Sequence, residues 1–272
     1  MLTTLRAIVL VVALAAVNFP VLVTLVTSFK SPAEVAGNPS LFIEQPTLEN
    51  YRAIFANSDR INISAYLVNS FAASAIGTVL AILLCLPAAY AISRSGLGRK
   101  YLLPVIVNLR VMPLVIFAIP IYMMYQWLGL LDTKLGLGLI LAVVNLPLTL
   151  VLLLNAVAEV PKEIEEAAAV EGASRLQTLV WIVVPLCRPA IVTTLVFGFI
   201  TAWNEFLFGL MLTTRDAVPV TVGASFFFSA GGGGVLWGVA SAVMIVAALP
   251  PMLLGMLLYS QLEGTMAGAV KG

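Results

Sequence analysis

The 272-residue sequence contains no histidine and, for its length, few charged residues. Without histidine, the chain lacks the commonest metal ligand and the commonest general acid–base group of enzymes. Charged residues make up 10% of the chain, compared with roughly 25% in soluble globular domains. The net charge of +1 gives no electrostatic basis for binding nucleic acid. We therefore expect no metal site, no catalytic residue and no nucleic-acid partner.

The sequence also lacks an ATP-binding loop and has few cysteines, which excludes further functions. The sequence has no G-x-x-x-x-G-K-[ST] loop to hold the phosphates of ATP, and its nearest glycine–lysine passage, residues 95–100, lacks that spacing. The only cysteines are Cys85 and Cys187, and they have no ligand-like spacing. We expect both cysteines to be buried as small apolar residues.

What the chain has in abundance is apolar sequence: 61% of its residues are hydrophobic and the mean hydropathy is +1.07. Several apolar runs are long enough to cross a hydrocarbon core of roughly 30 Å. The predicted spans lie at about 5–29, 66–93, 101–127, 135–158, 187–212 and 235–258. The remaining segments are predicted external loops at 30–65 and 213–234 and a polar loop at 159–186. The sequence thus predicts an all-α integral membrane protein with one transmembrane domain, residues 1–272.

Basic residues decide the predicted orientation of these six spans. An even number of spans puts both termini on one side, and the cytoplasmic side carries more Lys and Arg. With the N-terminus inside, the cytoplasmic basic residues are Arg6, Arg94, Arg99, Lys100, Lys162, Arg175, Arg188 and Lys271. The external basic residues are then Lys30, Arg52, Arg60, Lys134 and Arg215. Both termini and the loop at 159–186 are therefore predicted to be cytoplasmic.

The segment Lys162–Pro189 is unusually polar for its place between two spans. Pro161 precedes Lys162–Val170, whose alanines and charges suit a short helix, and proline is common just before a first turn. Glutamates fall near that turn, where the helix dipole favours negative charge. Gly172 can take the left-handed conformation that ends a helix. Ala167–Ala169 leave one side nearly smooth, so another protein can approach closely.

A second helix is predicted directly afterwards, over Arg175–Val184 with Ser174 as its N-cap. Its apolar face consists of Leu176, Leu179, Val180 and Val183. The two helices form a helix–turn–helix on the cytoplasmic surface that another protein can bind. The alternative is a solvated connector between two spans, because exposed charged helices are common and exposure alone does not indicate a partner.

The same segment resembles a known motif. Its Glu166-Ala167-Ala168, Gly172-Ala173, Ile182 and Pro185 match the EAA loop of bacterial ABC-importer permeases, written EAA-x-x-Asp-Gly-Ala with I-x-L-P downstream. Glu171 replaces the usual Asp and Val184 the usual Leu. Further matching segments are Thr27–Lys30 with Glu49–Tyr51, Asn69-Ser70, Trp203–Leu207 and Gly268–Gly272. Over nearly its whole length the chain resembles the maltose-transporter-type second permease subunit of the carbohydrate-uptake branch.

The resemblance implies a mechanism and a set of partners. The helix in the EAA loop is a coupling helix between spans 4 and 5, and it docks on a cytoplasmic ABC ATPase. Expected partners are two copies of that ATPase, a second homologous permease, an extracytoplasmic sugar-binding protein and membrane lipid. The ATPase holds ATP and magnesium, so this chain is a transport subunit without its own cofactor in the bacterial cytoplasmic membrane. The expected ATPase-coupling residues are Glu165, Glu166, Ala167, Ala168, Glu171, Gly172, Ala173 and Arg175.

Polar residues inside the predicted spans are costly in hydrocarbon and are candidates for the translocation path. The candidates are Asn108, Arg110, Asn145, Asn204 and Glu205. An Arg110–Glu205 ion pair is not expected, because they lie roughly 13 Å and on the order of 20–25 Å from the inner ends of their spans. The alternative is that these residues form hydrogen bonds between helices for packing.

Two other classes of function fit the sequence less well than an ABC permease does. An ion-coupled secondary transporter needs titratable residues at mid-membrane, and among the spans only Glu205 qualifies. A membrane-embedded enzyme needs a nucleophile and a base, which a chain without histidine or clustered carboxylates in its spans does not offer. The sequence does not distinguish maltose-like oligosaccharides, trehalose, glycerol phosphate and polyols as the substrate. It also does not indicate which of the two permease subunits contacts the substrate.

Overall fold

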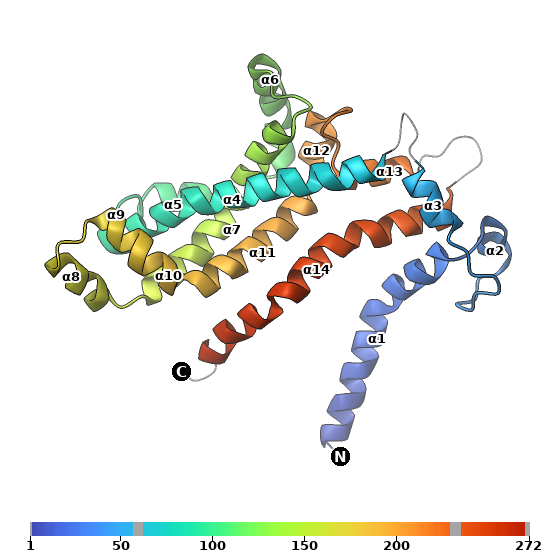
Figure 1. Ribbon diagram of the computed structural model, residues 1–272, viewed down its shortest axis with the longest axis horizontal. Helices are drawn as coiled ribbons and strands as arrows, with labels where there is room; N and C mark the ends of the chain where they lie inside the picture. The colour runs from blue at the N-terminus through green and yellow to red at the C-terminus, as the bar shows by residue number, and fades with distance from the viewer. Residues whose placement is uncertain (1, 57–61, 229–234, 270–272) are drawn as a thin grey trace. The chain divides into compact units, whose positions relative to one another are not determined.

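The computed structural model describes residues 2–56, 62–228 and 235–269, and within them every regular element is helical (Figure 1). The elements are α1 (Leu2–Ser28), α2 (Pro32–Gly37), α3 (Glu49–Phe55), α4 (Ile63–Ser95), α5 (Leu102–Asn108), η1 (Leu114–Phe117), α6 (Ala118–Leu128), α7 (Lys134–Glu159), α8 (Lys162–Val170), α9 (Arg175–Thr178), η2 (Leu179–Val183), α10 (Val184–Leu186), α11 (Arg188–Trp203), α12 (Leu207–Leu212), α13 (Val220–Phe226) and α14 (Trp237–Ala269). The chain forms two compact units: unit 1 is Met1–Leu67 with Val222–Pro250, and unit 2 is Val68–Thr221 with Pro251–Gly272.

Four helices are long and apolar enough to cross a membrane. They cover Thr4–Ser28, Ile63–Ser95, Lys134–Glu159 and Trp237–Leu257. These helices coincide with the predicted first, second, fourth and sixth spans. A fifth candidate is the pair Arg175–Leu186 and Arg188–Trp203, which bends by 77° at the break. The fold therefore contains several membrane-crossing helices, while the count of six spans stays a prediction.

The predicted third span, residues 101–127, is not one continuous helix, and whether it crosses the membrane stays a prediction. α5 ends at Asn108, and the chain turns before η1 and α6 continue it to Leu128. The residue before η1 is Pro113, at φ −61° and ψ 117° in extended backbone. Proline has no N–H to donate and its ring clashes with the preceding turn, so Pro113 favours a break, although Pro87 and Pro147 lie inside the continuous helices α4 and α7. Pro120 is tolerated because it lies in the first turn of α6.

The predicted fifth span, residues 187–212, is also divided. α11 ends at Trp203, and α12 starts at Leu207. Between them the carboxylate of Glu205 accepts hydrogen bonds from the backbone N–H groups of Leu207 and Phe208, at 3.0 and 2.9 Å. A carboxylate that satisfies the free N–H groups of a starting helix stabilises that start.

The core of unit 2 forms where α4, α7 and α11 pack closely. A Cβ added to Gly77 of α4 would lie 2.7 Å from Cβ of Leu141, and one added to Gly138 of α7 would lie 2.5 Å from Ile76. Such glycines let helix backbones approach where side chains would separate them. Cys85 and Cys187 are 2% and 3% exposed within this core, as the sequence predicted.

Unit 1 contains the predicted external loop 30–65, which is folded by hydrogen bonds rather than left open. Lys30 donates from Nζ to the carbonyls of Asn38 and Ser40, at 2.8 and 2.6 Å. The side chain of Asn50 donates to the carbonyls of Ser28 and Lys30, at 2.9 and 2.8 Å. The end of α1 and the loop with α2 and α3 therefore form one folded region. Residues 57–61 of the predicted loop lie outside the described residues.

Candidate functional site

The helix predicted in the loop 159–186 is present as α8, and its C-terminal end has the predicted geometry. Gly172 has φ +90°, in the left-handed region that favours glycine. The N–H of Gly172 donates to the carbonyl of Ala169 at 3.0 Å, and that of Ala173 to Ala168 at 2.9 Å. This pair of bonds is the Schellman motif, which satisfies the last carbonyls of a helix. The turn after α8 is therefore fixed by Gly172.

The second helix begins as predicted but presents a different face. Ser174 and Gln177 form a reciprocal capping box at its start. The helical run extends to Leu186 and includes the π-helical turn η2. Leu179 and Val183 are buried, but Leu176 and Val180 of the predicted apolar face are 69% and 45% exposed. A π-turn has i→i+5 hydrogen bonds, so it changes which side chains share a face.

The outer surface of α8 is small and acidic. Glu166, Ala167 and Ala169 are exposed, and Val170 is 89% exposed. Ala168 points inward instead, so the expectation of a smooth side made of three successive alanines is wrong. The physical reason is the helical period, which turns each successive residue by about 100°. Glu171, Gly172 and Arg175 are also exposed, and Ala173 is half-buried.

Glu165 differs from its neighbours because its carboxylate is held within the chain. Arg94, in the last turn of α4, donates from Nε to Oε1 of Glu165 at 2.7 Å, and its Nη2 lies 2.7 Å from the same oxygen. The hydroxyl of Tyr90 donates to Oε2 at 2.9 Å. Arg94 also donates from Nη2 to the carbonyl of Val160, directly after α7, at 2.7 Å. We call this arrangement the Arg94–Glu165 clasp; sequence reasoning missed Arg94's part in it.

The predicted path residues do not converge on one site. Asn145 is 1% exposed, and its Nδ2 donates to the carbonyl of Gly198 at 3.1 Å. This contact between α7 and α11 fits the packing alternative. Asn204 is exposed and donates to the carbonyl of Ile200 within its own helix at 2.8 Å. Asn108 is exposed at the end of α5, and Glu205 caps α12.

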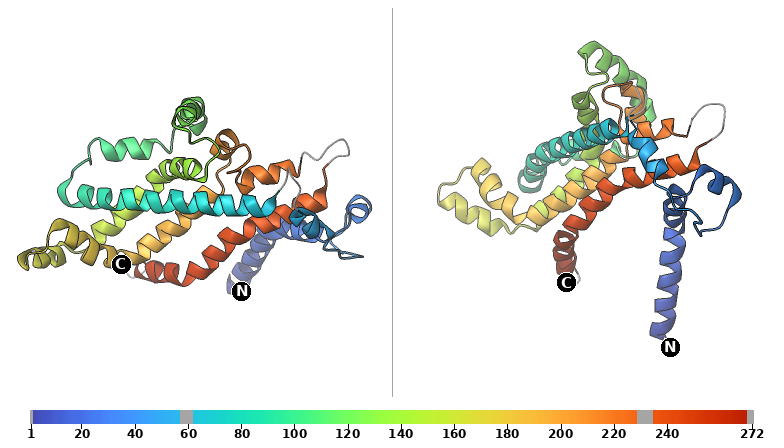
Figure 2. Two further views of the ribbon diagram at one scale, coloured as in Figure 1. Left: turned by 45° about the horizontal axis from the view of Figure 1, so that its top comes forward. Right: turned by 45° about the vertical axis from the view of Figure 1, so that its right-hand side comes forward.

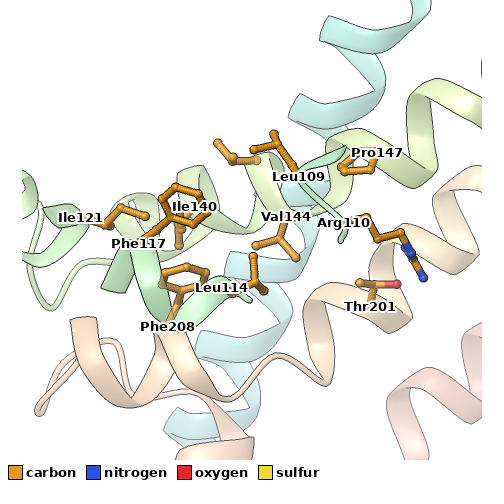
Figure 3. A pocket seen from close by; sticks show the side chains of 11 residues that line it. Leu109, Arg110, Leu114, Phe117, Ile121, Ile140, Val144, Pro147, Thr201 and Phe208 are labelled. Atoms are coloured by element: carbon orange, nitrogen blue, oxygen red, sulfur yellow. The ribbon is translucent and has the colours of Figure 1, made fainter. Parts of the chain in front are cut away.

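Arg110 lines a pocket of about 430 Å³ between α6, α7, α11 and the break in the predicted third span. Figure 3 shows Arg110 and Thr201 on one side of this pocket and Phe117 and Ile121 on the other. Its walls are otherwise mostly apolar. The sequence indicated Arg110 as an intramembrane charge, but no local pattern distinguished Thr201 or the two phenylalanines, Phe117 and Phe208, from other residues of apolar runs.

Figure 2 shows that α8 and α12 lie at opposite ends of α7. A second held carboxylate, that of Asp132, lies just before α7, at the end away from α8. Asp132, at φ 54°, accepts hydrogen bonds at 3.0 Å from the backbone N–H groups of Thr214, Arg215, Asp216 and Ala217. Partial burial by itself raises the pKa of Asp132, but these N–H donors outweigh it and lower the pKa to about 2. The loop after α12 is thereby fixed to the start of α7. We call this arrangement the Asp132 cradle.

The same loop is also tied to α4. Asn69 donates from Nδ2 to the carbonyls of Asp216 and Val218, each at 3.1 Å. The hydroxyl of Ser70 accepts a hydrogen bond from the N–H of Val220 at 2.7 Å. Both residues are buried. The Asn69-Ser70 pair, which matched the family pattern in the sequence, therefore anchors this loop to α4.

Comparison with known proteins agrees with the geometry of the chain. The family described as "Binding-protein-dependent transport system inner membrane component" matches residues 81–268. The sulfoquinovosyl glycerol transport system permease protein SmoH of Agrobacterium fabrum is 32% identical over 93% of this chain and 89% of its own. The trehalose/maltose transport system permease protein MalG of Thermococcus litoralis is 32% identical over 93% and 91%.

A solved structure shows the same fold. It is the crystal structure of a bacterial ABC transporter involved in the import of the acidic polysaccharide alginate, with a TM-score of 0.77, 20% identity and coverage of 95% of both chains. The family match, the two relatives and this fold agree with one another. The chain belongs to the family of binding-protein-dependent transport system inner membrane components and is a permease subunit of an ABC importer.

Proposed function

We propose that this chain pairs with a second permease subunit to import a sugar or a related polyol or sugar derivative, driven by a separate ATPase. The observation that carries the substrate class is the set of relatives aligned over about the whole chain, whose names specify sulfoquinovosyl glycerol, trehalose with maltose, and trehalose. The partners are two copies of a cytoplasmic ABC ATPase and an extracytoplasmic sugar-binding protein. Among the solved neighbours is an alginate ABC transporter in complex with its periplasmic protein.

The proposed contact with the ATPase is the exposed surface of α8. Glu166 is free to pair with a basic residue of the ATPase, since a charge-assisted hydrogen bond is among the stronger polar contacts. Ala167 and Val170 provide a small apolar surface beside it. Gly172 fixes the turn that presents this surface, and Arg175 follows on the next helix. Glu165 and Ala168 belong to the inner side and support α8.

The proposed topology has six crossings with both termini in the cytoplasm of a bacterial cell and α8 at the cytoplasmic surface. The third crossing consists of α5, η1 and α6, and the fifth consists of α11 and α12, each interrupted as described. A helix interrupted at membrane depth is tolerated where the freed backbone groups lie within the protein or line a cavity. The pocket at Arg110 is such a place. Labelling of single cysteines at positions 97 and 170 from each side of the membrane tests this orientation.

The proposed translocation path includes the pocket at Arg110. Asn108, Asn204 and Glu205 lie at the breaks of the same two interrupted crossings. Arg110 supplies a cation and Thr201 a hydroxyl, while the phenylalanine faces offer the apolar surface on which a sugar ring packs. Asn145 serves helix packing instead. Sugar uptake by vesicles carrying an Arg110→Ala variant that assembles normally tests this role, because unchanged affinity and rate would exclude it.

The decisive experiment is ATPase stimulation of the complete reconstituted complex by the binding protein with maltose, trehalose, sulfoquinovosyl glycerol or glycerol 3-phosphate. We expect one of these compounds to stimulate hydrolysis and to be imported. A Glu166→Lys variant should insert normally but lose the ATPase, whereas Glu163→Gln, on the same helix, should retain it. Uptake that continues after ATP depletion while an ion gradient persists would instead favour an ion-coupled transporter.

A further inference from the structure

α8 is held to the rest of the protein in an unusual way. Of its nine residues, all described by the structure, only Ala168 is buried. The one large apolar residue in its first two turns, Ile164, is 42% exposed. Apolar packing therefore contributes little to holding α8 against the rest of unit 2. The carboxylate of Glu165, with 10% of its side chain exposed, supplies the specific contacts that fix its orientation.

The helical run after α8 is attached differently. Leu179, Val183 and Cys187 belong to the same buried apolar cluster as Cys85 of α4 and Leu153 of α7. Apolar contacts of this kind are spread over a large surface and are lost only when the core separates. A small rotation of α8, by contrast, changes a few directional hydrogen bonds. The connection between α8 and α4 therefore depends on the Arg94–Glu165 clasp.

We propose that the Arg94–Glu165 clasp makes α4 move together with α8, so that Arg94 is a positioning residue for transport. This inference rests on the proposed function of α8 as the helix that the ATPase binds. Arg94 suits the role because its planar guanidinium reaches Glu165 of α8 and the carbonyl of Val160 at the end of α7 simultaneously. Its side chain is 14% exposed, so water competes weakly for these bonds. One side chain thus joins three elements.

The other end of α4 is bound to the loop after α12, so α4 connects α8 to that loop. Asn69 and Arg94 are separated by 25 residues of one continuous helix, or about 37 Å at 1.5 Å per residue. At that far end Asn69 and Ser70 bind the loop after α12, which the Asp132 cradle also holds. When the Arg94 end of α4 is displaced, the loop at 213–220 is therefore displaced with it. Both connections lie within unit 2.

The test measures whether α4 and α8 move as one body. Spin labels are placed at Leu97, the second residue after α4, and at Lys162 of α8, which are both exposed, after Cys85 and Cys187 are replaced by alanine. Distances are recorded in the complete complex without nucleotide and with MgATP and vanadate. In the otherwise native complex we expect the same distance distribution in both states. In Arg94→Gln or Glu165→Gln we expect the distribution with MgATP and vanadate to broaden or lengthen while the ATPase still co-purifies.

A second readout separates coupling from a merely structural role. We expect ATP consumed per sugar molecule imported to rise by about fivefold or more in Arg94→Gln, with the sugar that stimulates the native complex. Arg94→Lys keeps the charge but loses the planar fork, so its ratio should be intermediate. Arg99→Gln removes an exposed arginine nearby, and Glu163→Gln removes an exposed glutamate of α8; both should behave as the native complex does.

The outcomes distinguish this inference from the proposed function. If Arg94→Gln gives the same distances and the same ATP-to-sugar ratio as Arg99→Gln, the clasp does not couple α4 to α8. If, in addition, Glu166→Lys releases the ATPase, the role of α8 stands and only the clasp is overturned. If Glu166→Lys retains a fully coupled ATPase, the docking role of α8 fails, and the inference about Arg94 falls with it.

Discussion

The two ends of unit 2 are each organised by one carboxylate, but the groups that hold it differ. Glu165 is held by side chains of another helix, namely the guanidinium of Arg94 and the hydroxyl of Tyr90. Asp132 is held mainly by four backbone N–H groups of one loop, with one side-chain donor, the hydroxyl of Thr214. Backbone donors cannot change rotamer, so the Asp132 cradle holds its loop in one conformation. The clasp instead joins separate helices through a few side-chain bonds, so a single substitution can detach α8 from α4.

The largest effect is expected from breaking the α8 end alone. Gly172→Pro cannot adopt φ +90° and removes the N–H that donates to Ala169. We expect all spans to insert and the ATPase and uptake to be lost, measured by co-purification and vesicle uptake. Gly129→Pro is the matched control, because Gly129 also has positive φ at a helix end but lies at the Asp132 end. Full uptake by Gly172→Pro would contradict the proposed role of the turn.

The next largest effect is expected from removing the Asp132 cradle. Asp132→Ala leaves four N–H groups and the hydroxyl of Thr214 without their acceptor, and a buried hydrogen bond to a charged group makes a net contribution of about 1.5–3 kcal/mol. Because Asp132 is half-buried, we expect a net loss of about 2–4 kcal/mol in thermal melting of the purified complex. Asp132→Asn, which tolerates positive φ and keeps one acceptor oxygen, should lose less. Equal melting of all three proteins would show that the loop does not depend on the carboxylate.

The lowered pKa of Asp132 also predicts that the stability of the fold depends on pH. The pKa is about 2 in the folded protein and 3.8 as the reference value. A carboxyl whose folded pKa is lowered stabilises the fold above its unfolded pKa, and this contribution is lost as the pH falls toward the folded pKa. The melting advantage of the native protein over Asp132→Asn should therefore shrink from pH 5 to pH 3. A constant difference would contradict the cradle's electrostatic role.

The smallest effect is expected from loosening the connection between the two ends. Asn69→Ala leaves the carbonyls of Asp216 and Val218 without their donor but keeps the Asp132 cradle intact. We expect a loss of about 1 kcal/mol in melting, with the ATPase still bound. Ser64→Ala is a control, because Ser64 is an exposed residue at the start of the same helix. A loss as large as that of Asp132→Ala would show that α4, and not the cradle, holds the loop.

Local signals in the sequence predicted the parts of the candidate site that neighbouring residues determine. Gly172 is followed by Ala173 and Ser174, and this order alone predicts a helix end, a turn and a new N-cap. The break at Pro113 was visible as a proline, but proline can bend a span as well as interrupt it. Whether Pro113 bends the helix or interrupts it depends on the packing of the surrounding helices. The apolar face of the second helix was misassigned because a π-turn leaves no sequence signal.

By itself, the sequence determined the membrane class, four long apolar helices and the helix–turn–helix at 162–186, because hydrophobic length and capping act over a few residues. Only the tertiary structure decided that Glu165 faces Arg94, 71 residues away, and that Asp132 faces a loop more than 80 residues away. Charges so distant in sequence meet only after helix packing fixes their positions. For this reason Glu165, expected among the residues that face the ATPase, supports α8 from within.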